Sequence, residues 1–255
     1  MNNSEILRIA MEQSARDIGC EVGDFLAEAS VVVPLRPGPD AKRYYRPPIG
    51  CNFVSYGNNV VAAATEELSA IVREYVDRFS FYHCFETPNL HWLNERLAEK
   101  GQAVCFMAEY FLPDVGRLSE IPCSCALRVL EKGRFDALYL PQWSNALCAD
   151  RRQLDVLCVS AYAGNALAGL AGCSADAEEM WQIGVDVLPE YRQRGIASAM
   201  TSRLALEILR RGKAPFYCAA WSNIRSVRNA IRSGFVPAWV EMTVKPLGLI
   251  DELNA

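Results

Sequence analysis

Apolar residues follow two different periods in the first half of this chain, one typical of helices and one typical of strands. Segments with apolar side chains every three or four residues predict amphipathic helices at 5–18, 66–79 and 89–99. Short apolar runs bounded by turn residues predict strands at 52–56, 60–64 and 102–111. The proline-rich segment 34–48 predicts a long loop.

The pattern becomes more regular from about residue 119. The predicted elements are a strand at 125–130, a short helix at 133–140, strands at 154–162, 166–173 and 180–187, a helix at 195–211, a strand at 215–220, a helix at 224–233 and a strand at 236–244. This order predicts an α/β (α+β) fold, in which a mixed sheet is flanked by helices and contains one parallel crossover. Pro113, Gly116 and Pro122 interrupt the periodicity and predict a smaller α/β domain at 1–120, followed by a second domain at 121–255.

Residues 156–175 carry no charge, and a run of that length is compatible with a transmembrane helix. The segment contains the turn dipeptide Gly164-Asn165 between two apolar runs, which favours a β-hairpin instead. The chain starts without the basic and apolar segments of a secretory signal. We therefore expect a cytoplasmic protein that does not associate with membranes.

Charge and cysteine content narrow the function further. The 26 basic and 30 acidic residues give a net charge of −4, which argues against a nucleic-acid partner. The ten cysteines of a chain this long, without a secretory signal, are expected to be reduced. Cys123-Ser124-Cys125 lacks the second pair that a zinc site needs, so we predict no metal.

The most informative stretch runs from Val185 to Ser198, where a strand, a turn and a helix follow one another. Free N–H groups and the positive end of the dipole make a helix N-terminus an anion site. Gly195 and Ala197 leave the backbone accessible, so a pyrophosphate group could approach it closely. The stretch has neither the G-x-G-x-x-G pattern of dinucleotide sites nor a Walker A lysine.

Two motifs in this half resemble one enzyme superfamily. The sequence RQRGIA at 192–197 fits the R/Q-x-x-G-x-G/A pattern of the GCN5-related N-acetyltransferases (GNAT), and Asn223 to Ser226 followed by Gly234-Phe235 resembles their later motif. Residues 126–245 are similar to that core. Residues 221–226 also look like the zwittermicin A resistance branch, whose members carry an extra N-terminal domain.

The resemblance implies that acetyl-CoA lies where strands 180–187 and 215–220 diverge. It implies that strand backbone, turn N–H groups and the second helix bind this co-substrate. The residues concerned are Val185, Val187, Arg192, Gln193, Arg194, Gly195, Ile196, Ala197, Ser198, Asn223 and Ser226. The implied reaction transfers an acetyl group to the primary amine of a small molecule.

The chain departs from the family pattern at two catalytic positions. Ala230 stands where many relatives have a tyrosine acid, and Trp181 stands where many have a glutamate base. An amine with a pKa of about 10.4 must still lose a proton, and a nearby carboxylate could accept it. Glu179, on the same strand face as Trp181, and Glu109, within an apolar run, are the candidates for catalysis, although either could be structural.

Two other functions stay open at this point. The missing acid and base are compatible with a non-catalytic sensor that binds acyl-CoA, and the acceptor could be a protein or peptide. The sequence does not define the oligomeric state. A cluster of aromatic and histidine residues in the N-terminal half could either wall an acceptor pocket or form the core of that half. This cluster comprises Phe79, Phe81, Tyr82, His83, Phe85, His91 and Trp92.

Overall fold

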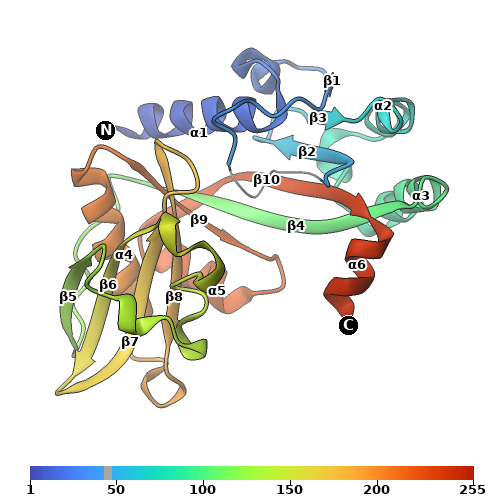
Figure 1. Cartoon of the computed structure of the whole chain (residues 1–255). Coiled ribbons are helices and arrows are strands. Elements are labelled where there is room, and N and C mark those ends of the chain that lie inside the picture. Colours follow the sequence, from blue (N-terminus) through green and yellow to red (C-terminus); the bar gives the residue numbers. More distant parts are fainter. Residues whose placement is uncertain (43–47) are drawn as a thin grey trace. The chain divides into compact units, whose positions relative to one another are not determined.

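The computed structural model describes residues 1–42 and 48–255 and divides them into two compact units (Figure 1). Unit 1 consists of Met1–Ile9 and Phe111–Pro237, and unit 2 consists of Ala10–Tyr110 and Ala238–Ala255. The last part of the chain is grouped with the N-terminal half, so these units are not the sequential ranges 1–120 and 121–255. Within the predicted loop 34–48, residues 43–47 lie outside the described residues.

Unit 1 contains five strands in the order β5-β6-β7-β8-β9. They are β5 (Ala126–Glu131), β6 (Asp155–Ala163), β7 (Ala166–Ser174), β8 (Met180–Val187) and β9 (Ala214–Ala219). Neighbouring strands are antiparallel except β8 and β9, which are parallel. The crossover between these two contains α4 (Ile196–Arg210), and α5 (Ile224–Arg232) follows β9. The predicted mixed α/β sheet flanked by helices is confirmed.

The uncharged segment 156–175 forms the β6–β7 hairpin, as predicted. Its turn contains Gly164 with a φ of 61°, a backbone conformation that glycine adopts without strain. In the described part of the chain, no helix has both the length and the apolar character needed to cross a bilayer.

The two faces of the unit 1 sheet are covered differently. On one face, α4 packs its buried stripe of Ile196, Met200, Leu204 and Ile208 against β6, β7 and β8. The segment between β5 and β6 forms a separate core cluster with Leu170 of β7 on the other face. That segment contains three short 3₁₀ helices, namely η4 (Asp136–Leu138), η5 (Pro141–Trp143) and η6 (Ala149–Leu154). A single short helix was predicted at 133–140, but the structure has only the 3₁₀ turn η4 there. Gly133, with a φ of 82°, belongs to the turn that precedes it.

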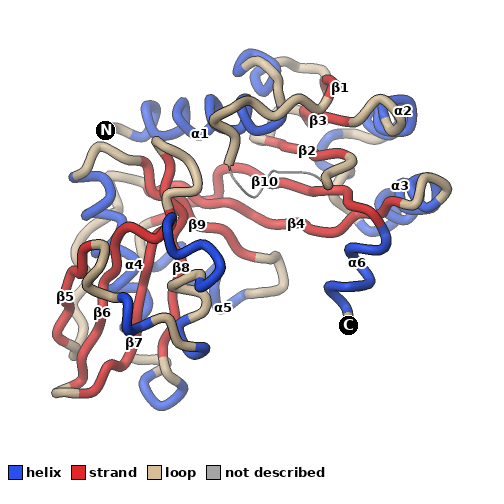
Figure 2. Tube along the Cα trace, viewed as in Figure 1, coloured by secondary structure: helices blue, strands red, loops and turns tan. Residues whose placement is uncertain are grey.

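The strands of unit 2 follow the order β1-β3-β2-β10-β4 (Figure 2). The strands are β1 (Val31–Pro34), β2 (Cys51–Ser55), β3 (Val61–Ala64), β4 (Gln102–Pro113) and β10 (Phe235–Pro246). The helices wholly within unit 2 are α2 (Ser69–Arg78), α3 (Thr87–Ala98) and α6 (Leu247–Asn254), with short 3₁₀ helices η1 (Val22–Leu26) and η3 (Phe81–His83). Helix α1 (Asn3–Ile18) belongs to unit 2 from Ala10 onward. The sequence pattern did not predict β1 or α6.

All ten cysteines lie in the described ranges, and all are free thiols. Burial raises the pKa of Cys158 and Cys173, so these thiols stay protonated in the core of unit 1. Within residues 1–42 and 48–255, no three side chains are grouped as metal ligands.

Candidate functional site

Strands β8 and β9 separate after a short paired stretch. Met180–Gln182 pair with residues 214–216, and across the described strands no further β8–β9 pairs follow, although both strands continue. The Ala214 N–H donates to the Glu179 carbonyl at one end of β8, and the Leu188 N–H donates to the Ala168 carbonyl of β7 at the other. The odd-numbered residues of β8 therefore direct their backbone groups toward the β9 side, and the even-numbered ones face β7. Val185 and Val187 thus present N–H and C=O groups to the opening.

The turn after β8 keeps its shape through its own side chains. It begins with a 3₁₀ helix, η7 (Pro189–Tyr191), and Gln193 adopts a φ of 63°. The Arg192 Nε donates to the Val187 carbonyl at 3.0 Å, and the Arg194 guanidinium donates to the Glu190 carbonyl at 3.0 Å. Both arginines thus bind the backbone of the turn, and one of them occupies the Val187 carbonyl. The N–H of Val187 and both backbone groups of Val185 stay directed to the opening.

Helix α4 begins at this turn without a side-chain cap. Gly195 is the N-cap residue with a φ of 76°, and no side chain accepts a hydrogen bond from the first turn. The leading N–H groups of a helix have no intrahelical partner, so those of residues 196–198 are available to an anion. A Cβ placed on Gly195 would meet no atom within 4 Å, which leaves space above the backbone.

The beginning of α5 is organised by a different set of hydrogen bonds. The Asn223 side chain accepts from the Ser226 N–H at 3.2 Å, which makes it a helix cap. The Ser226 hydroxyl lies 2.8 Å from the Tyr217 hydroxyl on β9. Burial raises the pKa of Tyr217, so its hydroxyl keeps its proton. Sequence reasoning missed Tyr217, although its place on the strand just before the Asn223 cap could have indicated it.

Side chains of α4 and α5 are linked beneath the opening. The Ser198 hydroxyl donates to the side-chain oxygen Oδ1 of Asn229 at 3.1 Å, and the Asn229 side-chain Nδ2 donates to the Thr201 hydroxyl at 3.0 Å. Ser198 therefore contributes its backbone rather than its hydroxyl to an anion site. Ala230, on the same helix, is fully buried and supplies no acidic group.

The predicted base Glu179 lies outside the opening. It precedes β8 on the side where β8 and β9 are still paired, and its carboxylate accepts from Lys213 at 2.8 Å. Eight residues of extended chain, about 26 Å, separate it from Val187. The structure therefore places Glu179 in an ion pair that joins the starts of β8 and β9, away from the turn that follows β8.

The second predicted base, Glu109, lies half-buried on β4 in unit 2. Burial raises the pKa of its carboxyl group. Among the described residues, no lysine, arginine or histidine forms an ion pair with it. A carboxylate whose pKa is raised by burial is a better proton acceptor than an ordinary one.

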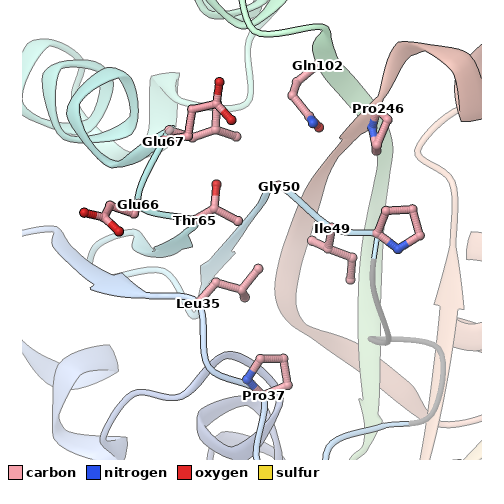
Figure 3. Close-up of a pocket in the computed structure, with 11 residues that line it drawn as sticks. Leu35, Pro37, Ile49, Gly50, Thr65, Glu66, Glu67, Gln102 and Pro246 are labelled. Atoms are coloured by element: carbon pink, nitrogen blue, oxygen red, sulfur yellow. The ribbon is translucent and has the colours of Figure 1, made fainter.

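The aromatic cluster of the N-terminal half is distributed between the core and the surface of unit 2. Phe79 and Trp92 pack against Tyr75, with ring centroids 5.2 and 5.9 Å away. Tyr82 is 61% exposed, and His91 lies on the surface beside Glu95 at 3.3 Å. None of these residues lines the pocket of unit 2 that Figure 3 shows.

Comparison with known proteins gives a family match and several structural neighbours. The model of the acetyltransferase (GNAT) family matches residues 117–235. No curated protein matches the sequence.

Three solved structures illustrate the neighbours. A putative GNAT-family acetyltransferase from Novosphingobium aromaticivorans is 20% identical over 56% of this chain and 66% of its own, with a TM-score of 0.44. A GCN5-related N-acetyltransferase-like protein from Streptococcus suis is 20% identical over 62% and 68%, with a TM-score of 0.46. A putative acetyltransferase from Salmonella typhimurium, solved with its cofactor acetyl-CoA, is 16% identical over 49% and 94%, with a TM-score of 0.35. The chain spans about two thirds of the first two structures.

Proposed function

Because residues 117–235 belong to the GNAT family of acetyltransferases, we propose that this protein transfers the acetyl group of acetyl-CoA to the primary amine of a small molecule. The observation that supports this most directly is the opening between β8 and β9, which leads to the uncapped start of α4. Along one edge of the opening, β8 has backbone N–H and C=O groups that could bind a ligand. At its end, the uncapped N–H groups of α4 could bind an anion. A co-substrate with an amide-containing arm and a pyrophosphate group needs both features.

Acetyl-CoA fits this opening in two places. The turn from Arg192 to Ser198 would bind the pyrophosphate through backbone N–H groups, with the space above Gly195 taken by phosphate oxygens. The β8 backbone at Val185 and Val187 would hydrogen-bond the amides of the pantetheine arm as an added strand does. The Asn223 side chain would contribute indirectly, because it caps the first turn of α5 and so positions Ser226.

The chemistry needs one proton acceptor and one hydrogen-bond donor. The amine loses one proton to the acceptor before its nitrogen attacks the acetyl carbon. As the C–N bond forms and the C–S bond breaks, the nitrogen releases its second proton, and the departing thiolate takes one up. The sequence nominates Glu109 and Glu179 as acceptors for the amine proton, and burial raises the pKa of the Glu109 carboxyl group. The Ser226 hydroxyl, held by Tyr217, is the proposed donor to the leaving thiolate, in place of the tyrosine that Ala230 replaces.

Steady-state release of CoA thiol from acetyl-CoA, measured across a panel of small amines and peptides, tests this function. We expect turnover with at least one small amine. Acetyl-CoA binding without turnover on any acceptor would contradict the enzyme assignment and favour a non-catalytic acyl-CoA sensor. The motive for that alternative is that Ala230 and Trp181 occupy the positions of the usual acid and base. Turnover on peptides alone would favour a protein N-acetyltransferase.

A further inference from the structure

A pocket of about 490 Å³ lies within unit 2 (Figure 3), apart from any residue predicted to bind acetyl-CoA. It is lined by Leu35 and Pro37 after β1, residues 48–50 before β2, the turn between β3 and α2, the start of β4 and the end of β10. Its volume is within the range of sites that hold small organic molecules. The pocket therefore has the size of a ligand site.

Backbone hydrogen bonds fix the frame of this pocket. The Gly50 N–H donates to the Val244 carbonyl at 2.9 Å, and the Gly50 carbonyl accepts from the Thr65 N–H at 2.9 Å. The Leu35 N–H donates to the Ala64 carbonyl at 2.8 Å. Because backbone hydrogen bonds to β3 and β10 position Leu35, Gly50 and Thr65, the pocket does not depend on side-chain packing alone.

Glycine is needed at the inner end of the pocket. A Cβ on Gly50 would lie 2.8 Å from the Leu68 side chain and 2.9 Å from the Gln102 amide oxygen. Figure 3 shows the Gln102 amide directed toward Gly50 and the Thr65 hydroxyl on the neighbouring side. Any larger residue at position 50 would displace the two side chains that shape this end.

The walls of the pocket are largely apolar, and the polar side chains among the described lining residues are either neutral or negatively charged. Leu35, Ile49, Leu68 and Pro246 supply the apolar surface. The carboxylates of Glu66 and Glu67 stand on one side, and among the lining residues that the structure describes there is no lysine, arginine or histidine. Glu67 pairs with Lys100 at 3.8 Å, whereas the structure records no ion pair for Glu66 among residues 1–42 and 48–255. The Gln102 amide oxygen, which is buried, receives no hydrogen bond within the same ranges.

We propose that this pocket binds a small organic ammonium ion, a primary amine carried on an apolar body. The apolar walls would take the body of the ligand, and Glu66 with Glu67 would attract its charge. A neutral molecule of the same shape would gain only the apolar contacts. Such an amine would be an effector, bound by unit 2 at a place that contains none of the residues proposed to bind acetyl-CoA.

Titration calorimetry of the full chain with 2-phenylethylammonium chloride, and with 2-phenylethanol as the neutral probe, tests the proposal. We expect the amine to bind at least about ten times more tightly than the alcohol, a difference of about 1.4 kcal/mol. The variant Glu66→Gln should weaken amine binding about three- to five-fold, as expected for an exposed charge. Glu74→Gln, an exposed change elsewhere on α2, is the matched control and should leave the affinity unchanged.

A second variant tests whether the amine binds in this pocket, without changing the charge of the protein. Leu35→Trp should fill the pocket and abolish binding of the amine, while thermal unfolding shows that the chain still folds and acetyl-CoA affinity stays unchanged. Equal binding of amine and alcohol, or undiminished amine binding in both Glu66→Gln and Leu35→Trp, would overturn the proposal. Altered turnover of a different amine on addition of 2-phenylethylammonium, lost in Leu35→Trp, would identify the bound amine as an effector. Because binding is read without turnover, failure of the acetyltransferase proposal would not affect this result.

Discussion

Gly195 combines a φ of 76° with open space where a side chain would begin, at the position proposed for the pyrophosphate. Gly195→Glu would place a carboxylate there and repel the phosphates, so we expect acetyl-CoA binding to be lost in calorimetry. Gly212 offers a matched control at the other end of α4, since its φ is 73° and a Cβ there also meets nothing within 4 Å. Gly212→Glu carries the same backbone strain and charge, and should bind acetyl-CoA as the wild type does. Equal affinity in the two variants would contradict the placement.

The Ser226 and Tyr217 hydroxyls, 2.8 Å apart, are proposed to support the leaving thiolate. Ser226→Ala should lower kcat about ten- to hundred-fold, because a hydrogen bond to a charged group contributes about 1.5–3 kcal/mol. Tyr217→Phe, which keeps the ring, should have a smaller effect in the same direction. Acetyl-CoA affinity should change little in either variant, since the hydrogen bond strengthens as charge develops. The control Ser222→Ala alters an exposed hydroxyl nearby and should retain wild-type kcat. A fall in affinity with unchanged kcat would assign the pair to binding.

At the scale of elements, the parts of the fold set by local sequence could be predicted and the parts set by distant contacts could not. The turn from β8 into α4 was predicted because glycine and the apolar stripe from Ile196 occur together in a few residues. The hairpin was predicted because a two-residue turn separates two apolar runs. The separation of β8 from β9 came from the family resemblance, since no residue near Gln182 signals where pairing ends.

Other elements depend on partners far along the chain. β1 pairs with β3 about thirty residues away, and β10 pairs with β2 almost two hundred residues away. Neither partner can be identified from hydrophobic periodicity, so the assignment of β10 to the N-terminal half was not predicted. The same limit applies to Glu179, because its ion pair with Lys213 joins two strands that are separated by a helix.

The face of β8 opposite α4 can be tested at Gly184. A Cβ there would lie 1.8 Å from the Asn145 carbonyl oxygen. That loop cannot easily move away, because the Asp186 carboxylate accepts from the N–H groups of Asn145 and Ala146, both at 2.9 Å. We expect Gly184→Ala to lower the free energy of unfolding by about 1–3 kcal/mol, as other overpacked sites do.

Gly116 provides the comparison for this change in the same unit. The nearest atom to a Cβ there is an Asp114 carboxylate oxygen at 3.4 Å, and the backbone has no positive φ. Gly116→Ala should change the free energy of unfolding by less than about 0.5 kcal/mol, measured by urea denaturation. If both variants unfold at the same urea concentration, the loop is not held against β8 as the structure indicates.

At the scale of the whole molecule, unit 2 closes around a buried lysine whose partners come from opposite ends of the sequence. The Lys42 ammonium is 3.0 Å from Asp17 on α1 and 3.6 Å from Glu241 on β10, and all three side chains are at most 4% exposed. The rings of Tyr110 and Trp239 lie 5.8 and 5.9 Å from the ammonium. Burial alone would lower the pKa of Lys42, but attraction to the two carboxylates raises it above its ordinary value.

Removing this lysine should unfold unit 2 more readily than removing a surface lysine. Lys42→Met removes a buried cation that pairs with two buried carboxylates, so we expect a loss of about 3–5 kcal/mol in the free energy of unfolding. Lys100→Met, the control, removes an exposed partner of Glu67 and should cost less than about 1 kcal/mol. Adding Asp17→Asn and Glu241→Gln to Lys42→Met should recover most of the loss, because no unpaired buried charge remains.

The loss in Lys42→Met should also depend on pH in a defined direction. Burial already raises the pKa of Asp17 in the wild type, despite the attraction of Lys42, and without Lys42 that pKa rises further. A carboxyl group with a higher pKa in the folded state binds its proton more tightly there than in the unfolded chain. The stabilisation from that proton is fully present below the unfolded pKa of about 3.9 and disappears as pH rises through the folded value. The difference in unfolding free energy between wild type and Lys42→Met, measured in urea, should therefore be smaller at pH 5 than at pH 8. A difference that stays constant over this range would mean that the carboxylates remain charged through contacts other than Lys42.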